Sequence, residues 1–298
     1  HRLAYPFPQS SSLKNNGEAY LENMARSLSE RSFKQAIINE ASTVASTKME
    51  NFLNRYGTAA VELNYSDKFH LDRADLDVLL PLWDCPQYLF FVQGGAHRSA
   101  ARLQSSVGAG LRYFSQFCVI GGNVFFDYDF KHTVSRFGAG LEYGRDFLRL
   151  SVNTYWHLSH WGIARDDNSS VERAANGWDI RAEAYWPSHP QWGGKLFYES
   201  YFGRNVVFGQ APSGTQNPYA VTLNVNYTPV PLLAFNANYQ LVSEQTPAVI
   251  RKGSFDLGVR MNYQLGVPLS SQLAPSAVKK MHTLMGSRYD LVSRNNDI

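Results

Sequence analysis

The amino-acid sequence predicts an all-β membrane protein, a 12-stranded antiparallel transmembrane β-barrel with a helical segment before it and a linker after it. Three observations lead to this prediction. Polar and apolar residues alternate over segments about twice as long as ordinary strands. Most charged residues of these segments share one face, and short connections alternate with long ones along the chain.

The composition excludes several classes of protein. Of the 298 residues, 18% are charged and 14% are aromatic, and the formal net charge is +3. This excludes intrinsic disorder, which goes with few aromatic residues and high net charge. No run approaches the ~18 apolar residues that a spanning helix requires, so a helical membrane protein is excluded. The 28 basic and 25 acidic residues are scattered, and we expect no nucleic-acid partner.

Two segments precede the alternating pattern. Residues 1–15 are rich in proline and serine, and we expect a disordered lead-in there. Residues 16–57 have the pattern of an amphipathic helix, with Leu21, Met24 and Leu28 at three-to-four spacing and Gly57 at the position of a C-terminal cap. We expect one long helix or two shorter ones, forming a periplasmic helical segment.

Residues 58–265 are the predicted barrel, because the period of the pattern changes there from 3.6 to 2. In "YAVTLNVNYT", for example, Tyr219, Val221 and Leu223 alternate with Ala220 and Thr222. Long strands with strict alternation are expected where ~9–11 tilted residues cross a bilayer. Such segments lie near residues 58–66, 69–82, 88–98, 102–114, 118–130, 133–144, 147–159, 176–187, 193–203, 218–228, 232–242 and 254–265.

The polar face of these strands carries too many charges for the packed core of a soluble protein. We therefore assign this face to the lumen of a hydrated pore. Its carboxylates could do acid–base work, but basic residues on neighbouring strands make a structural charge network that holds the tail the simpler interpretation. The predicted lumen-facing network consists of Glu62, Arg73, Asp75, Asp77, Arg112, Asp127, Asp129, Arg136, Glu142, Arg149, Arg181, Glu183, Lys195, Glu199 and Arg260.

The apolar face and the connections indicate how the barrel sits in its membrane. Aromatic residues such as Trp83, Tyr113, Trp156 and Trp192 stand near strand ends, as in interfacial girdles. The connections after even-numbered strands are short, whereas the three longest follow the seventh, ninth and eleventh strands. Short turns of outer-membrane barrels face the periplasm, so both ends of the barrel segment should be periplasmic.

Residues 266–298 are predicted to be a linker inside the pore. Ser-x-x-Gln and Pro275 can start a helix that Gly286 caps, and the residues after it have an extended pattern. A helix of ~11 residues followed by about 12 extended residues exceeds the ~40–45 Å of a bilayer, so the tail can pass through the pore. The candidate linker residues are Lys279, Lys280, Arg288, Tyr289, Asp290 and Arg294.

The stretch "NTYWHLSHWG", residues 153–162, raises two chemical alternatives. On a helix, His157 and His160 could bind one metal ion, and on a strand His157 and Ser159 could form the dyad of an outer-membrane acyl hydrolase. On a strand, however, the two histidines diverge, and alternation places His157 and Ser159 in the lumen, away from lipid. We therefore expect no catalytic, cofactor-binding or metal site, and the acyl hydrolase is the weakest alternative.

The two cysteines, Cys85 and Cys118, follow the second and fourth predicted strands. Both positions are on the periplasmic rim, an oxidising compartment where disulfides form. A disulfide between them is one hypothesis. Two unrelated thiols are the other, because turns that are not adjacent can be too far apart to be bridged.

Several motifs give the chain a resemblance to a known family. They include "LNRYGTAAVELN", "GGNVFFDYDF", "RLSVNTYWHLSHW", "ERAANGWDIRAEAYWPSHPQWGGKLFYESYFG" and the closing "GSRYDLVSRNNDI". In this order they resemble the intimin/invasin family of inverse autotransporters, over roughly residues 30–298. Nothing in the chain resembles the LysM module that some members carry upstream.

The resemblance implies a function. In that family a 12-stranded outer-membrane barrel follows a periplasmic segment, and the chain then runs back through the pore to carry immunoglobulin-like passenger domains to the surface. It implies an outer-membrane translocator and anchor without enzymatic activity, with its C-terminus toward the cell surface. The implied partners are outer-membrane lipid and lipopolysaccharide, its own C-terminal passenger, the barrel-assembly machinery, periplasmic chaperones and a receptor reached through the passenger. A porin or channel plugged by its own tail is the alternative.

Overall fold

The computed structural model describes residues 57–99, 102–131, 133–158, 162–163, 171–172, 175–203, 217–244 and 253–297. The predicted lead-in and the predicted N-terminal helical segment lie outside these ranges, apart from Gly57. His160 and Ser159 lie outside them as well.

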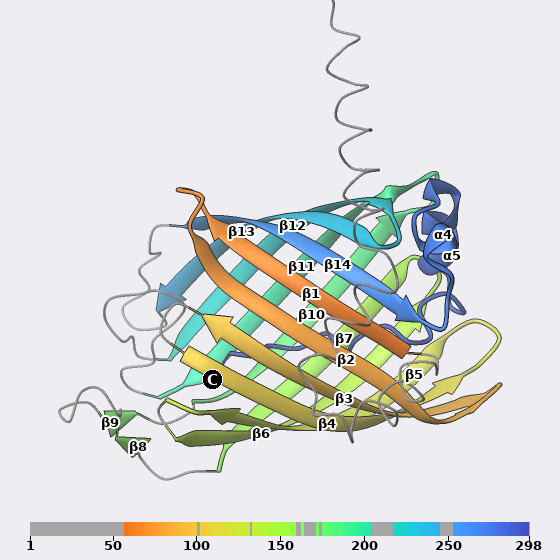
Figure 1. Ribbon diagram of the computed structural model, residues 1–298. Coiled ribbons are helices and arrows are strands. Elements are labelled where there is room, and N and C mark those ends of the chain that lie inside the picture. The colour runs from red at the N-terminus through yellow and green to blue at the C-terminus, as the bar shows by residue number, and fades with distance from the viewer. Residues whose placement is uncertain are drawn as a thin grey trace, which may run out of the picture. The chain divides into compact units, whose positions relative to one another are not determined.

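Twelve antiparallel strands close into a barrel in the order β1-β14-β13-β12-β11-β10-β7-β6-β5-β4-β3-β2 (Figure 1). The predicted fold class is confirmed, and β4 has the predicted bounds, whereas β11 begins at His189, before the predicted start at 193. A separate two-stranded sheet, β8 (Gly162–Ile163) with β9 (Val171–Glu172), was not predicted. The barrel strands are β1 (Gly57–Ser66), β2 (Leu71–Cys85), β3 (Tyr88–Ser99), β4 (Arg102–Phe114), β5 (Val119–Asp129), β6 (Val134–Arg145), β7 (Leu148–His157), β10 (Asn176–Trp186), β11 (His189–Phe202), β12 (Pro218–Val230), β13 (Leu233–Glu244) and β14 (Ser254–Leu265).

The two faces of the wall follow the alternation of the sequence. On β7, Tyr155 is 1% exposed inside the barrel, whereas the next residue, Trp156, is 45% exposed on the outside. Leu150 and Val152 are exposed on the same outer face, and Ser151 is buried inside. A closed barrel satisfies every strand backbone group within the wall, which lets an apolar surface face lipid.

The two rims differ in their connections. β2 and β3 are joined through Pro86 and Gln87, and the links from β6 to β7, β10 to β11 and β12 to β13 are also of two residues. These turns lie at one end of the barrel, which we call the short-turn rim, and the opposite end is the long-loop rim (Figure 1). This division matches the loop pattern expected from the sequence.

The segment after β14 is less helical than predicted. It forms α4 (Leu269–Gln272), the 3-10 turn η1 (Pro275–Ala277) and α5 (Val278–Met281), so the prediction of one helix of about 11 residues is wrong. Pro275 holds Ala274 in an extended conformation and separates α4 from η1. After Met281, the carbonyl of His282 accepts a hydrogen bond from the N–H of Phe147 at 2.9 Å, which joins this segment to the turn between β6 and β7.

The hypothesised disulfide between Cys85 and Cys118 is not formed, because both cysteines are free thiols in the structure. Strands β3 and β4 separate β2 from β5. At about 4.8 Å per strand, that separation exceeds the Cα–Cα distance of about 7 Å that a disulfide tolerates. Cys118 instead belongs to the β4–β5 turn, where its carbonyl accepts a hydrogen bond from Ser115 at 3.0 Å.

Among the described residues, no helix is long and apolar enough to cross a membrane.

The outward face of β12 provides a test of the lipid contact. Leu223 is exposed on this face near the middle of the strand, and its neighbour Asn224 points into the lumen. We expect Leu223→Arg to lower the free energy of unfolding in lipid vesicles by about 2–4 kcal/mol, the range for arginine on the lipid face near the midplane. Asn224→Arg is the matched control and should lower it much less, as urea titration can measure. Equal effects would contradict the assignment of the faces.

Candidate functional site: the lumen and its tail

The lumen contains a segment of the same chain, residues 282–297, which we call the pore tail. It leaves α5 at the short-turn rim and passes inside the barrel toward the long-loop rim (Figure 1). Its regular structure ends at α5, and turns are followed by residues 290–297 without helix or strand. Contacts along the wall therefore fix its course.

The first fixed point is Arg288, at the short-turn rim. Its guanidinium donates to Asp84 Oδ1 at 2.9 Å from Nε and at 2.5 Å from Nη2. It also donates to the carbonyl oxygens of Cys85, Pro86 and Tyr88 in the β2–β3 turn. The turn thus surrounds one guanidinium with acceptors, an arrangement that suits the five donors of arginine.

Neighbouring groups strengthen this rim contact. The Arg288 guanidinium lies over the ring of Phe114, 4.3 Å from its centroid. The backbone carbonyl oxygen of Arg288 accepts a hydrogen bond from Arg112 Nη1 at 3.1 Å, and the hydroxyl of Tyr289 donates to Asp84. Two residues of the tail therefore share one carboxylate of the wall.

The second fixed point is Arg294, deeper in the lumen. Its Nη1 and Nη2 donate to the two carboxylate oxygens of Asp127 at 2.7 and 2.5 Å. Arg136 also donates to Asp127, at 2.9 Å from Nε, and Asp127 and Arg136 are each 1% exposed. The guanidinium of Arg136 further donates to the carbonyl oxygens of Asn295, at 2.8 Å, and Asp297, at 2.5 Å. Buried charges of this kind persist only where partners satisfy them.

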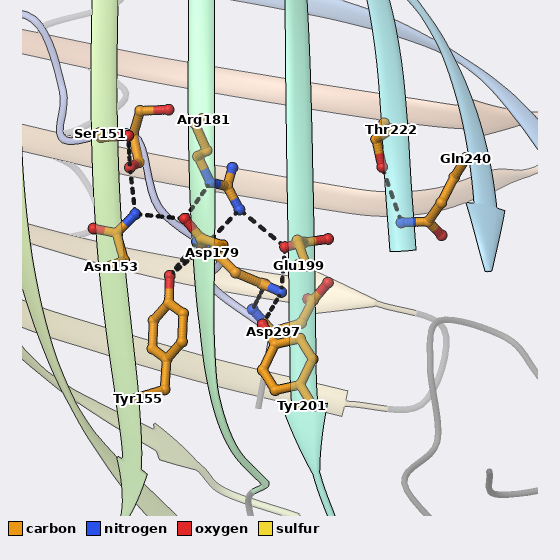
Figure 2. Close-up of polar contacts among 12 residues, drawn as sticks. Ser151, Asn153, Tyr155, Asp179, Arg181, Glu199, Tyr201, Thr222, Gln240 and Asp297 are labelled. Atoms are coloured by element: carbon orange, nitrogen blue, oxygen red, sulfur yellow. Dashed lines mark hydrogen bonds and ion pairs between the residues drawn. The ribbon is translucent and has the colours of Figure 1, made fainter. Parts of the chain in front are cut away.

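The tail then contacts the wall formed by β7, β10 and β11. Asn295 donates from its side chain to Glu199 at 2.9 Å and to the hydroxyl of Tyr201 at 2.6 Å. Its backbone N–H donates to the hydroxyl of Tyr155 at 2.8 Å. Tyr155 in turn donates to Asp179, which joins the network of Arg181 and Glu199 that Figure 2 shows.

Near the long-loop rim, Asp297 accepts a hydrogen bond from Arg73 at 2.6 Å, and Arg73 also pairs with Asp75 at 2.5 Å. Arg73 lies opposite Ser99, the last residue of β3. The pore tail therefore reaches from the β2–β3 turn at one rim to the ends of the same two strands at the other.

An apolar cluster also holds the tail. Leu284 and Val292 of the tail are buried, and Leu291 and Tyr289 pack alongside them. The sequence pattern indicated a uniformly polar lumen and did not predict this core. The residues that the wall contributes to this cluster are Leu79, Leu89, Phe91, Phe114, Val119 and Phe125.

The tail fills only part of the lumen. The hydrogen bonds of residues 283–297 to the wall run to β2 through β7, β10, β11 and their turns. A cavity of about 1110 Å³ lies beside the tail and is lined by it and by polar residues such as Thr222, Asn226 and Asn236 of β12 and β13. One side of the lumen binds the tail, and the other side is open and polar.

Comparison with known proteins identifies the architecture. The family described as "Inverse autotransporter, beta-domain" matches residues 10–296. The chain belongs to the inverse autotransporter β-domain family.

Relatives and a solved structure agree with this assignment. The chain is 40% identical to "Intimin" of Citrobacter freundii, over 92% of this chain and 28% of that protein. It is 41% identical to "Inverse autotransporter adhesin YeeJ" of Escherichia coli (strain K12), over 87% of this chain and 11% of that protein. The solved structure described as "Unveiling the Mechanism Behind the in-meso Crystallization of Membrane Proteins" is 39% identical, covers 82% of this chain and 98% of its own, and superposes with a TM-score of 0.77. The chain thus spans less than a third of either relative.

The structure of this inverse autotransporter barrel places the predicted charged residues in neighbouring pairs. Arg112 Nε lies 2.8 Å from Glu142, Lys195 Nζ lies 3.2 Å from Glu183, and Arg260 Nη1 lies 3.6 Å from Glu62. Asp129 lies 3.9 Å from Arg102. Arg149 differs, because it donates to the carbonyl oxygens of Leu148 and Thr283 and lies 4.0 Å from Asp290 of the tail.

Two of the predicted linker residues are placed differently. Lys279 and Lys280 are exposed on α5 at the short-turn rim, so their assignment to the pore is wrong. The reason is that the tail enters the lumen only after α5. Arg288, Tyr289, Asp290 and Arg294 follow α5 and do contact the wall.

Sequence reasoning missed several acidic residues of the lumen network and of the contacts with the tail. Asp179 has the same alternation phase as Arg181 and Glu183, and counting back by two would have found it. Asp84 and Asp146 lie in or beside short turns, and Asp146 accepts a hydrogen bond from the N–H of Leu284 at 2.6 Å. Side chains alternate between the two faces only within a strand. The alternation pattern therefore does not indicate which turn residues face the lumen.

The chemical alternatives receive no support from the geometry. His157 contacts Asn176 through both its backbone N–H and its ring Nδ1. Another arrangement has the order of a nucleophile, base and acid: Ser106 Oγ is 3.1 Å from His97 Nε2, and His97 Nδ1 is 3.1 Å from Asp75. Ser106 is only 7% exposed and is not among the residues that line the cavity beside the tail. Among the described residues, no group of three or more His, Cys, Asp or Glu is arranged to hold a metal ion.

Removing the negative charge of Asp127 should strongly lower the free energy of unfolding of the inverse autotransporter barrel. Asp127→Asn leaves Arg136 and Arg294 without their shared carboxylate, and breaking such a buried pair costs about 3–5 kcal/mol. We expect a loss of this size in the free energy of unfolding. Glu62→Gln is the control, because Glu62 and Arg260 are each 26% exposed and such pairs contribute about 0–1 kcal/mol. Denaturant titration measures both, and a small effect at Asp127 would contradict the assignment.

The contact of the tail at the short-turn rim should depend on pH. The His282 ring stacks on Tyr185 with centroids 3.6 Å apart, and its burial, with Arg149 and Lys195 nearby, lowers its pKa from 6.5 to about 4. When the tail is undocked, the His282 imidazole becomes protonated near its ordinary pKa of 6.5. When the tail is docked, the imidazole becomes protonated only near pH 4. Docking is therefore most stable above pH 6.5 and weakens as the pH falls toward 4.

Thermal unfolding between pH 4 and pH 7.5 measures this dependence. In His282→Phe the ring contact with Tyr185 is kept and the titration is removed. The difference in melting temperature between the two proteins should change with pH over this range. A constant difference would exclude His282 as the source.

Proposed function

We propose that this chain is the outer-membrane translocator and anchor of an adhesin-type passenger that is C-terminal to the pore tail. The observation that carries the proposal is the course of the tail through the barrel, from Arg288 at the short-turn rim to Asp297 near the other rim. A chain that follows this course can continue on the far side of the membrane. The relative named as an inverse autotransporter adhesin supports the nature of the passenger.

The proposed orientation has the short-turn rim in the periplasm and the long-loop rim at the cell surface. It is supported by the general rule that outer-membrane barrels have short periplasmic turns and longer outer loops. Residues that precede Gly57 would then be periplasmic, and the C-terminus would point outward. The exposed lysines of α5, Lys279 and Lys280, would face the periplasm.

The proposed mechanism needs no catalytic group in this chain. Folding of the exported passenger outside the cell would drive transport, and the wall would then retain the tail through Arg288, Arg294 and their carboxylates. Outer-membrane lipid and lipopolysaccharide would surround the apolar face. By family membership we include the barrel-assembly machinery and periplasmic chaperones as partners, and the passenger as the part that meets a receptor.

An epitope tag fused after Ile298 tests the proposal. On intact cells that express the full chain, antibody should bind this tag. A matched tag inserted in the β4–β5 turn at Gln116 should stay unlabelled until the outer membrane is permeabilised. If the tag after Ile298 also needs permeabilisation, the proposal is wrong and the tail is the plug of a channel.

A further inference from the structure

The lumen wall around Arg294 is built in layers, with a glycine behind an aromatic ring and the guanidinium over that ring. Phe125 points into the lumen and its ring lies flat against the neighbouring strand at Gly108. A Cβ atom at Gly108 would stand 2.4 Å from Phe125 Cδ1, which is closer than any side chain tolerates. The ring can lie flat here only because residue 108 has no side chain.

Arg294 is the next layer. Its guanidinium carbon lies 4.3 Å from the ring centroid of Phe125 and 5.7 Å from that of Tyr155. A Cβ atom at Gly138 would stand 3.3 Å from Arg294 Nη2. The guanidinium therefore lies over the ring of Phe125, with the ring of Tyr155 farther away, and the backbone at Gly138, which carries no side chain, lies close to its Nη2.

Charge attraction alone does not explain the presence of Arg294. Asp127 is already paired with Arg136, and both are almost wholly buried. A second cation brings the group to two positive charges and one negative charge. Arg294 adds two hydrogen bonds, one to each carboxylate oxygen of Asp127, from a guanidinium that also lies over the ring of Phe125.

We propose that Phe125, Asp127 and Tyr155, with Gly108 and Gly138 as the floor, form a binding site specific for a guanidinium group. The ligand of this site in the chain is Arg294. The inference rests on the proposed function, because the site would bind the residue at which the exported chain is retained. A lysine at position 294 would not bind in this site. Its ammonium is a strongly hydrated point charge that can neither stack nor bind a carboxylate in parallel.

Hydrogen exchange of two tail amides reports occupation of the site. The N–H of Val292 donates to Gln93 Oε1 at 2.9 Å, and the N–H of Asn295 donates to Tyr155. In the purified full chain, Arg294→Ala should accelerate their exchange at least about tenfold, because it breaks a buried charge pair. Arg294→Lys should accelerate it as much as alanine does. Protection at the original level in the lysine variant would overturn the proposal.

Chemical rescue tests specificity without relying on the lysine variant. Methylguanidinium added to Arg294→Ala should restore protection of the two amides, and methylammonium at the same concentration should not. Equal rescue by both ions would show that the site selects charge only and would overturn the proposal. No rescue by either ion, with strand content intact by circular dichroism, would also overturn it.

The glycine floor has a matched control. Gly108→Ala drives a Cβ atom into Phe125, so it should accelerate exchange and, combined with Arg294→Ala, abolish rescue. Gly122→Ala, on the adjacent strand, places its Cβ atom no closer than 3.9 Å to any neighbour and should change nothing. If Gly108→Ala does not fold, the rescue of Arg294→Ala decides the question alone.

These measurements separate the site from the proposed function. Amide protection is read in the purified protein, whereas the surface tag is read on cells. Normal guanidinium selectivity with an inaccessible tag would refute export and leave the site intact. An accessible tag with no selectivity would refute the site alone.

Discussion

The structure depends on one constraint, the closed ring of backbone hydrogen bonds that lets the chain cross lipid. Closure uses the N–H and C=O groups of every strand for the wall itself. It also forces alternate side chains inward, so the lumen receives about half of the residues of each strand. Asp127, Arg136 and Asp179 are buried there although the barrel is surrounded by lipid. Each of these charges requires a partner within the lumen.

The tail supplies many of those partners, and it does so without regular structure. Its carbonyl and N–H groups bond to side chains of the wall: Gln93 accepts from Val292, and Ser151 and Asn153 donate to Ser293. Leu284 and Val292 cover apolar side chains that would otherwise meet water. The tail thus completes a small core within the barrel, which explains how an irregular segment has a defined path.

Sequence reasoning predicted the wall far better than the tail, for a physical reason. The period of two is a local property, so β4 and the burial of Tyr155 beside exposed Trp156 followed from adjacent residues. The contacts of the tail join residues as far apart in sequence as Arg288 and Asp84, and no local period encodes them. The predicted tail helix is interrupted before Pro275, and the carbonyl of His282 accepts a hydrogen bond from Phe147 of the wall, a long-range contact that no local pattern encodes.

The same constraint determines how a barrel can retain a chain inside itself. Because the backbone groups of the strands are engaged in the wall, a segment in the lumen cannot add to the sheet, and among the described residues no backbone–backbone hydrogen bond joins 283–297 to a strand. Apart from the bond between the N–H of Phe147 and the carbonyl of His282 at the rim, the hydrogen bonds of the described tail to the wall involve a side chain on at least one partner. Retention of the tail therefore depends on the side chains of the tail itself. A segment without arginines at positions 288 and 294 could not make the same contacts with Asp84 and Asp127.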